Sequence, residues 1–147
     1  MTDPRITPCG LVCGVPAQAK GVTAYKGIRY AIAGRWQYPV PVTHWDGVYH
    51  AEKYGPCAVQ QSAFISEKDS GRDPFYYREF REGLGYTYSE DCLFLNIWAP
   101  DNAQKAPVIV YIHGGAFLGG SGWDKVFDEP HWPRQGVIAV TINYRLG

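Results

Sequence analysis

The sequence lacks an excess of charge of one sign, a long apolar run and an N-terminal leader pattern. Its 14 basic and 14 acidic residues balance, so we expect neither nucleic acid nor an anionic membrane surface as a partner. No apolar run approaches the ~20 residues that a membrane-spanning helix needs. The first residues, MTDPRITPCG, contain no charged stretch followed by an apolar one. A cytoplasmic protein is therefore the expectation.

The cysteines lack the spacing that is typical of a metal site. The four are Cys9, Cys13, Cys57 and Cys92. They form no CxxC pair, and no histidine accompanies them in a zinc pattern. We interpret Cys9 and Cys13 as small buried residues, and His50 as a surface or structural histidine. The sequence thus predicts no metal site and no cofactor.

Two apolar runs in the last third of the chain predict a buried parallel sheet. Val108–Ile112 and residues 137–143 are β-branched and apolar, as in strands that are buried on both faces. The residues between them suffice for a crossover connection, which joins parallel strands. Earlier, residues 22–25 and 28–31 are β-type runs separated by Gly27, and they predict a small antiparallel hairpin or meander. We therefore expect an α/β fold with a mixed, mostly parallel sheet after a small antiparallel meander.

Residues 58–89 form a long segment without a clear strand or helix pattern. A segment of this length inside a compact domain is usually functional or mobile. It contains a cluster of aromatic residues: Phe75, Tyr76, Tyr77, Phe80, Tyr86 and Tyr88. Aromatic side chains line apolar pockets, but they also fill cores, so both interpretations stay open.

A glycine-rich segment, HGGAFLGGSG, directly follows the first apolar run and occupies residues 113–122. Ligands of open α/β sheets bind outside the carboxyl ends of strands. Adjacent glycines bring backbone N–H groups close to a ligand, and two such groups can hold a developing oxyanion in acyl transfer. The segment lacks the GxxxxGK[ST] pattern of a phosphate loop, and Lys125 is misplaced for that role. An oxyanion loop is favoured over a phosphate loop, and a simple turn remains an alternative.

Five segments, in order, resemble the type-B carboxylesterases, which include bacterial p-nitrobenzyl esterases. The segment PVIVYIHGGAF is similar to the oxyanion-hole segment of that family, and SEDCLFLN is similar to its SEDCLYLN signature. The segments YKGIRYA, RWQYPVP and VIAVTINYRLG match three further family motifs. The resemblance covers essentially the whole chain, and it implies the N-terminal part of a single α/β-hydrolase domain over residues 1–147.

The resemblance also implies roles for the residues of the glycine-rich segment. Gly115 and Ala116 are expected to donate their backbone N–H groups to the oxyanion, while Gly114 sets the turn. His113 is expected to act structurally, because the family's catalytic histidine comes much later in the chain. Phe117 and Trp123 are expected to shape the substrate pocket.

Two further pairs take structural roles by the same resemblance. Arg35 and Glu90 correspond to a buried ion pair at the base of the 58–89 segment. Cys57 and Cys92 align with a disulfide that closes this segment. Because thiols normally stay reduced in the cytoplasm, a bridge and two free thiols remain equally open alternatives.

The chain lacks the GxSxG elbow that carries the nucleophilic serine of this family. Ser121 lies in GGSGW, but no strand directly precedes it, so we reject it as the nucleophile. The expected function is that of a serine carboxylic ester hydrolase whose Ser–Glu/Asp–His triad lies on a missing or companion segment, with a small-molecule ester as substrate. The alternatives are a non-catalytic binding relative and a nonfunctional truncated product.

Overall fold

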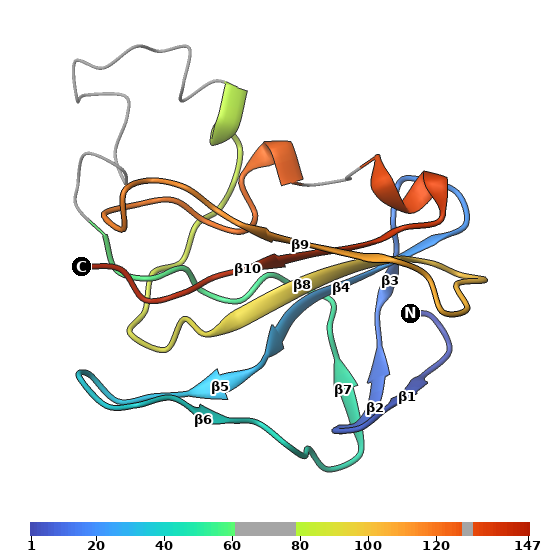
Figure 1. Ribbon diagram of the computed structural model, residues 1–147, viewed down its shortest axis with the longest axis horizontal. Helices are drawn as coiled ribbons and strands as arrows, with labels where there is room; N and C mark the ends of the chain where they lie inside the picture. The colour runs from blue at the N-terminus through green and yellow to red at the C-terminus, as the bar shows by residue number, and fades with distance from the viewer. Residues whose placement is uncertain (61–78, 128–130) are drawn as a thin grey trace.

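The computed structural model describes residues 1–60, 79–127 and 131–147, which form three β-sheets (Figure 1). The largest sheet has five strands in the order β3 (Val15–Pro16), β4 (Val22–Arg29), β8 (Phe94–Pro100), β10 (Ile138–Ile142), β9 (Val108–Ile112). The second has three strands, β1 (Arg5–Thr7), β2 (Gly10–Cys13) and β7 (Val48–His50). The third pairs β5 (Ala31–Ile32) with β6 (Val40–Pro41). Two short 3₁₀ helices, η1 (Lys125–Phe127) and η2 (Trp132–Gln135), lie between β9 and β10.

The two apolar runs form parallel neighbours, as the sequence predicts. Val108 pairs with Ile138, and the register continues without a break to Ile112 and Ile142. The wider expectation of a mostly parallel sheet is wrong for the part of the chain that the structure describes. The pairs β3–β4, β4–β8 and β8–β10 are all antiparallel. The crossover from β9 inserts β10 between β9 and β8, so only the last pair of this sheet is parallel.

The runs at residues 22–25 and 28–31 do not form a hairpin. Residues 22–29 are one strand, β4, whose pairing with β8 shifts register between Tyr25 and Ile28. Gly27 lies at this irregularity with φ 70°, and a Cβ added there would approach the carbonyl oxygen of Lys53 to 2.3 Å. The glycine therefore permits a bulge rather than a turn. The antiparallel pairs of this region are β1–β2 and β3–β4.

Strand β9 is exposed, in contrast to its predicted burial on both faces. All five residues of β9 are exposed, from 38% at Ile109 to 64% at Ile112. The strand lies at the edge of the five-stranded sheet, and only β10 pairs with it among the described residues. Apolar periodicity reports how hydrophobic a strand is, but whether another element covers it depends on the tertiary arrangement.

The interior of the main sheet combines apolar packing with a buried amide. Trp98 of β8 packs with Val22 and Ala24 of β4, and it is 1% exposed. Asn96, on the same strand, accepts a hydrogen bond from the N–H of Gly27 at 2.9 Å and donates one to Thr141 Oγ1 at 3.0 Å. These bonds link β4, β8 and β10 across the sheet. Among the described residues, no helix has the length and apolar character needed to cross a bilayer.

Candidate active site

The glycine-rich loop lies at the carboxyl end of β9, where the sequence places it. Residues 114–118 are exposed, whereas His113 before them and residues 119–124 after them are buried. Within the described part of the chain, the backbone N–H groups of Gly115 and Ala116 donate no hydrogen bond. These two groups are therefore available to a ligand, which an oxyanion site requires.

The backbone of this loop depends on Gly115 more than on Gly114. Gly115 has φ 113°, a conformation that side chains rarely adopt, and an added Cβ would lie 1.9 Å from the carbonyl oxygen of Gly119. At Gly114 an added Cβ meets nothing within 4 Å. The resemblance assigns the turn to Gly114, but the residue whose conformation requires glycine is Gly115.

The next two residues keep the chain in the left-handed region. Ala116 has φ 53° and Phe117 has φ 59°, which is uncommon for residues with a Cβ. Two hydrogen bonds hold this turn: Leu118 N–H donates to the oxygen of Gly115, and Gly147 N–H donates to that of Phe117, both at 2.9 Å. The Phe117 side chain is 71% exposed, so it is accessible to a ligand beside the loop.

Two buried amide side chains anchor the end of the loop. Gln60 accepts a hydrogen bond from the N–H of Gly120 and donates one to its oxygen, both at 3.1 Å. Asn143 accepts from the N–H of Gly122 at 2.8 Å and donates to the oxygen of Pro56 at 3.1 Å. Neither residue was predicted from the sequence. Asn143 belongs to the NYRLG segment, whose resemblance to a family motif is a signal that could have identified it. Nothing in the sequence around Gln60 indicates that its partner is Gly120.

His113 occupies a structural position at the base of the loop. It is 5% exposed, and its Nδ1 lies 2.8 Å from the oxygen of Gly114. Its ring stacks on Tyr144 at a centroid distance of 4.3 Å, and the Tyr144 hydroxyl donates to the His113 oxygen. Burial lowers the pKa of His113, so the neutral ring is favoured. This geometry supports the loop rather than a general base.

Trp123 lies in the interior rather than on a pocket wall. It is 4% exposed and stacks on Tyr54 at 4.9 Å and on Tyr86 at 4.4 Å. Its contact with substrate therefore stays a prediction. Tyr86 donates to Asp124 at 2.5 Å, and burial raises the pKa of that carboxyl. Phe75, Tyr76 and Tyr77 lie outside the described residues.

Cys57 and Cys92 are free thiols, so the alternative without a disulfide is the one observed. Cys57 donates to Ser121 Oγ at 3.2 Å, and burial raises its pKa to about 12. Burial likewise raises the pKa of Cys92 to about 11. Ser121 is 0% exposed and also accepts from the N–H of Trp123 at 3.1 Å. A buried, hydrogen-bonded hydroxyl cannot reach a substrate, which agrees with its rejection as a nucleophile.

Arg35 and Glu90 form the predicted ion pair, but the pair is not buried. Their side chains are 68% and 53% exposed. The Arg35 guanidinium lowers the pKa of Glu90 through a direct hydrogen bond. Arg35 lies on the connection between β5 and β6, where its side chain is open to solvent. An exposed pair of this kind contributes little to stability.

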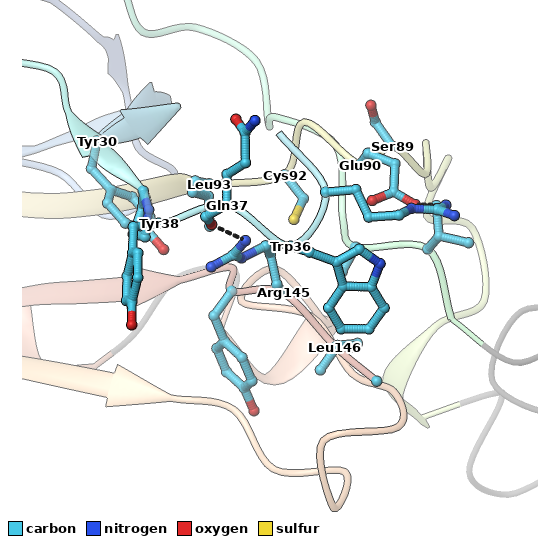
Figure 2. Close-up of a pocket in the computed structure, with 16 residues that line it drawn as sticks. Tyr30, Trp36, Gln37, Tyr38, Ser89, Glu90, Cys92, Leu93, Arg145 and Leu146 are labelled. Atoms are coloured by element: carbon cyan, nitrogen blue, oxygen red, sulfur yellow. Dashed lines mark hydrogen bonds and ion pairs between the residues drawn. The ribbon is translucent and has the colours of Figure 1, made fainter. Parts of the chain in front are cut away.

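Two surface cavities flank the loop. A cavity of about 240 Å³ is lined by His113, Gly114, Gly115 and Gly120, together with side chains that include Asp124. A larger one, about 800 Å³, lies between the β5–β6 connection and the chain end; Trp36 and Tyr38 line it, and Arg145 donates to the Gln37 oxygen at 2.8 Å (Figure 2). Tyr144, which stacks on His113, also lines the larger cavity. The smaller cavity is lined by Gly115, one of the two predicted oxyanion donors, so it is the better candidate for binding the reacting group.

The chain is similar to several curated esterases. The chain is 40% identical over 137 residues to the para-nitrobenzyl esterase of Bacillus subtilis (strain 168), covering 86% of this chain and 24% of that protein. It is 32% identical over 154 residues to the fumonisin B1 esterase of Sphingopyxis macrogoltabida, covering 99% and 25%. It is 36% identical over 152 residues to the acetylcholinesterase of Bungarus fasciatus, covering 96% and 23%. The chain thus spans about a quarter of the length of the curated relatives it matches.

Solved structures show the same relationship. A PNB esterase superposes with a TM-score of 0.77 at 37% identity, covering 98% of this chain and 28% of the other. A thermophilic PNB esterase superposes with a TM-score of 0.76 at 38% identity, again covering 98% and 28%. The chain therefore has the same fold as the 28% of the PNB esterase on which it superposes, which is part of an α/β-hydrolase fold. The carboxylesterase family profile matches residues 4–147, and the chain belongs to that family.

Proposed function

We propose that this chain forms part of a serine carboxylic ester hydrolase and supplies two donors of its oxyanion hole. The observation that carries the proposal is the pair of exposed N–H groups of Gly115 and Ala116, which donate no hydrogen bond within the described chain. They lie at the carboxyl end of a parallel strand, where α/β folds bind ligands. Family membership favours acyl transfer as the reaction.

In the proposed reaction, a serine outside this chain attacks the carbonyl carbon of an ester. The carbonyl oxygen acquires negative charge, and the two N–H groups hold it by hydrogen bonds. The intermediate then collapses, the alcohol leaves, and water hydrolyses the acyl-enzyme. Loss of one oxyanion donor typically costs about 3 kcal/mol in the transition state.

We further propose that the nucleophile, acid and base lie on a segment beyond these residues or on a companion chain. The chain contains no GxSxG elbow, and Ser121 is buried. The exposed edge strand β9 offers a surface against which that segment can pack. The substrate class that fits is a small, uncharged ester, because the exposed Phe117 lies beside the donors.

The test is labelling with a fluorophosphonate probe, followed by peptide mapping of every chain in the purified protein. The expected result is one labelled serine outside these 147 residues, together with hydrolysis of p-nitrophenyl acetate. The isolated 147-residue chain is the control, and we expect it to remain unlabelled. A label on Ser121, or no label and no hydrolysis in the complete protein, would overturn the proposal.

A further inference from the structure

Three side chains that are separate in the sequence meet at one end of the three-stranded sheet. Cys13 ends β2 and His50 ends β7, and these two residues are register partners in the parallel pair β2–β7. The two strands lie side by side in Figure 1. Glu52 follows two residues after His50. The Sγ of Cys13 lies 3.3 Å from His50 Nδ1, which lies 3.3 Å from Glu52 Oε1. The sequence does not indicate that Cys13 and His50 are neighbours, because parallel pairing across 37 residues has no spacing signature.

The backbone aims these three side chains in a common direction. Parallel register partners share a face, and residues two apart in an extended chain also point the same way. Ala51, between His50 and Glu52, is 0% exposed and packs in the core with Val12 and Tyr25. Its N–H donates to the oxygen of Cys13 at 2.9 Å, and its oxygen accepts from the N–H of Lys26 at 2.8 Å. The ligand atoms are thus presented by anchored backbone on the face opposite this core.

The arrangement is unsuitable for a Cys–His–Glu nucleophilic triad. A triad uses one ring nitrogen for the nucleophile and the other for the carboxylate. Here the thiol and the carboxylate both lie beside the same atom, His50 Nδ1. Ligand atoms that converge on one point are instead the arrangement that a metal ion requires.

The distances agree with tetrahedral coordination. Bonds of about 2.3 Å from Zn²⁺ to sulfur and about 2.0 Å to nitrogen and oxygen place tetrahedral ligand atoms about 3.3–3.6 Å apart. Both measured separations are 3.3 Å, and all three ligand atoms lie within 4.8 Å of one another. An ion can therefore be accommodated by small side-chain movements.

We propose that Cys13, His50 and Glu52 bind a divalent transition metal ion, with Zn²⁺ as the expected ion. A thiolate, an imidazole and a carboxylate are all zinc ligands, and soft sulfur selects against Ca²⁺ and Mg²⁺. Cys13 is 2% exposed, whereas the side chains of His50 and Glu52 are 59% and 34% exposed. The ion therefore enters from solvent and retains water at its fourth position. Binding joins β2, β7 and the segment after β7, so the site is a structural clip.

The test is titration of the purified, reduced protein with Co²⁺, a spectroscopic substitute for Zn²⁺. We expect a thiolate-to-cobalt charge-transfer band that saturates at one ion per chain and disappears when Zn²⁺ is added. Cys13→Ser should abolish the band. Cys9→Ser is the matched control, because Cys9 lies outside the cluster, beside the oxygen of Val42. A band that is unchanged in Cys13→Ser, or no band in the wild type, would overturn the proposal.

Because Cys13 is buried, its substitution can disturb the fold as well as remove a ligand. Variants of the two more accessible ligands, His50 and Glu52, control for this effect. His50→Ala and Glu52→Gln should each keep the wild-type circular dichroism spectrum and weaken Co²⁺ binding. Removal of a residue that only hydrogen-bonds to a metal ligand typically weakens metal binding about 10- to 100-fold. Removal of a direct ligand should weaken Co²⁺ binding by more than this. The melting temperature should rise with Zn²⁺ in the wild type but not in His50→Ala. Equal affinity in His50→Ala and wild type would refute the assignment. The readouts involve no ester hydrolysis, so their outcome is independent of the proposed function.

Discussion

The conformation of Gly115 makes the glycine-rich loop sensitive to a single methyl group. Gly115→Ala adds a Cβ at a position with φ 113°, 1.9 Å from the carbonyl oxygen of Gly119. Ordinary van der Waals separations are about 3.5 Å or more, so the two groups must move apart by more than about 1 Å. Gly114→Ala is the matched control for structure, because the same methyl group there meets nothing within 4 Å.

The displacement should alter the loop more than the fold. The strained conformation costs on the order of 1–3 kcal/mol, and the exposed loop can relax part of this by moving. Movement separates the N–H groups of Gly115 and Ala116 from the position at which we propose that they hold an oxyanion. A misplacement of about 1 Å costs on the order of 100-fold in rate, so we expect kcat of the proposed ester hydrolysis to fall by at least that factor in the complete protein.

Two measurements separate this effect from general destabilisation. The first is amide hydrogen exchange at Leu118, whose N–H bonds to the oxygen of Gly115 at 2.9 Å. Exchange there should accelerate in Gly115→Ala and stay at the wild-type rate in Gly114→Ala. The second is the rate of p-nitrophenyl acetate hydrolysis. Equal Leu118 exchange in the two variants, or a wild-type kcat in Gly115→Ala, would contradict this prediction.

Three further predictions concern the loop's support and the sheet edge. Asn143→Ala removes the hydrogen-bond partner of both the Gly122 N–H and the Pro56 oxygen. The free energy of unfolding, measured by urea titration, should fall by about 2–4 kcal/mol. A decrease of less than about 1 kcal/mol would contradict this prediction. Burial lowers the pKa of His113 below its ordinary value of 6.5. The buried neutral ring therefore contributes stability above pH 6.5, and this contribution is lost as the pH falls through the folded-state pKa. Wild-type stability should therefore fall more between pH 7 and 5 than that of His113→Asn, by up to about 1.4 kcal/mol per pH unit, and equal slopes would refute it. Val110→Lys should reduce self-association of the 147-residue chain, measured by light scattering, because Val110 is 56% exposed on the edge strand β9. Gln104→Lys is the control: it adds the same charge outside that strand and should leave self-association unchanged.

The family and the position of the glycine-rich loop were predictable from local patterns. The run Val108–Ile112 followed by HGGAF indicates a strand that ends in a glycine-rich loop, and the structure has both at these residues. Strand-and-loop motifs of this kind are local, because their chemistry resides in backbone N–H groups within a few residues. The pairing of β9 with β10 was predictable for the same reason, since two apolar runs and a crossover permit few arrangements.

Burial and long-range contacts were not predictable from the same patterns. The ion pair of Arg35 and Glu90 forms but is exposed, and β9 is exposed although its composition is that of a buried strand. Burial depends on which elements cover a residue, and covering elements come from distant parts of the chain. Gln60 shows the same limit, since its partner Gly120 lies 60 residues away.

Contiguous residues were enough to indicate the family, to locate the glycine-rich loop that we propose as an oxyanion site, and to show that no GxSxG elbow occurs in these 147 residues. The tertiary structure decided that Gly115 rather than Gly114 needs to be glycine, that Cys57 and Cys92 are free, and that Cys13, His50 and Glu52 converge. The first depends on the backbone angles at one residue, and the other two depend on how side chains from distant segments are placed relative to each other. Neither quantity has a local signature, so residue order does not reveal it.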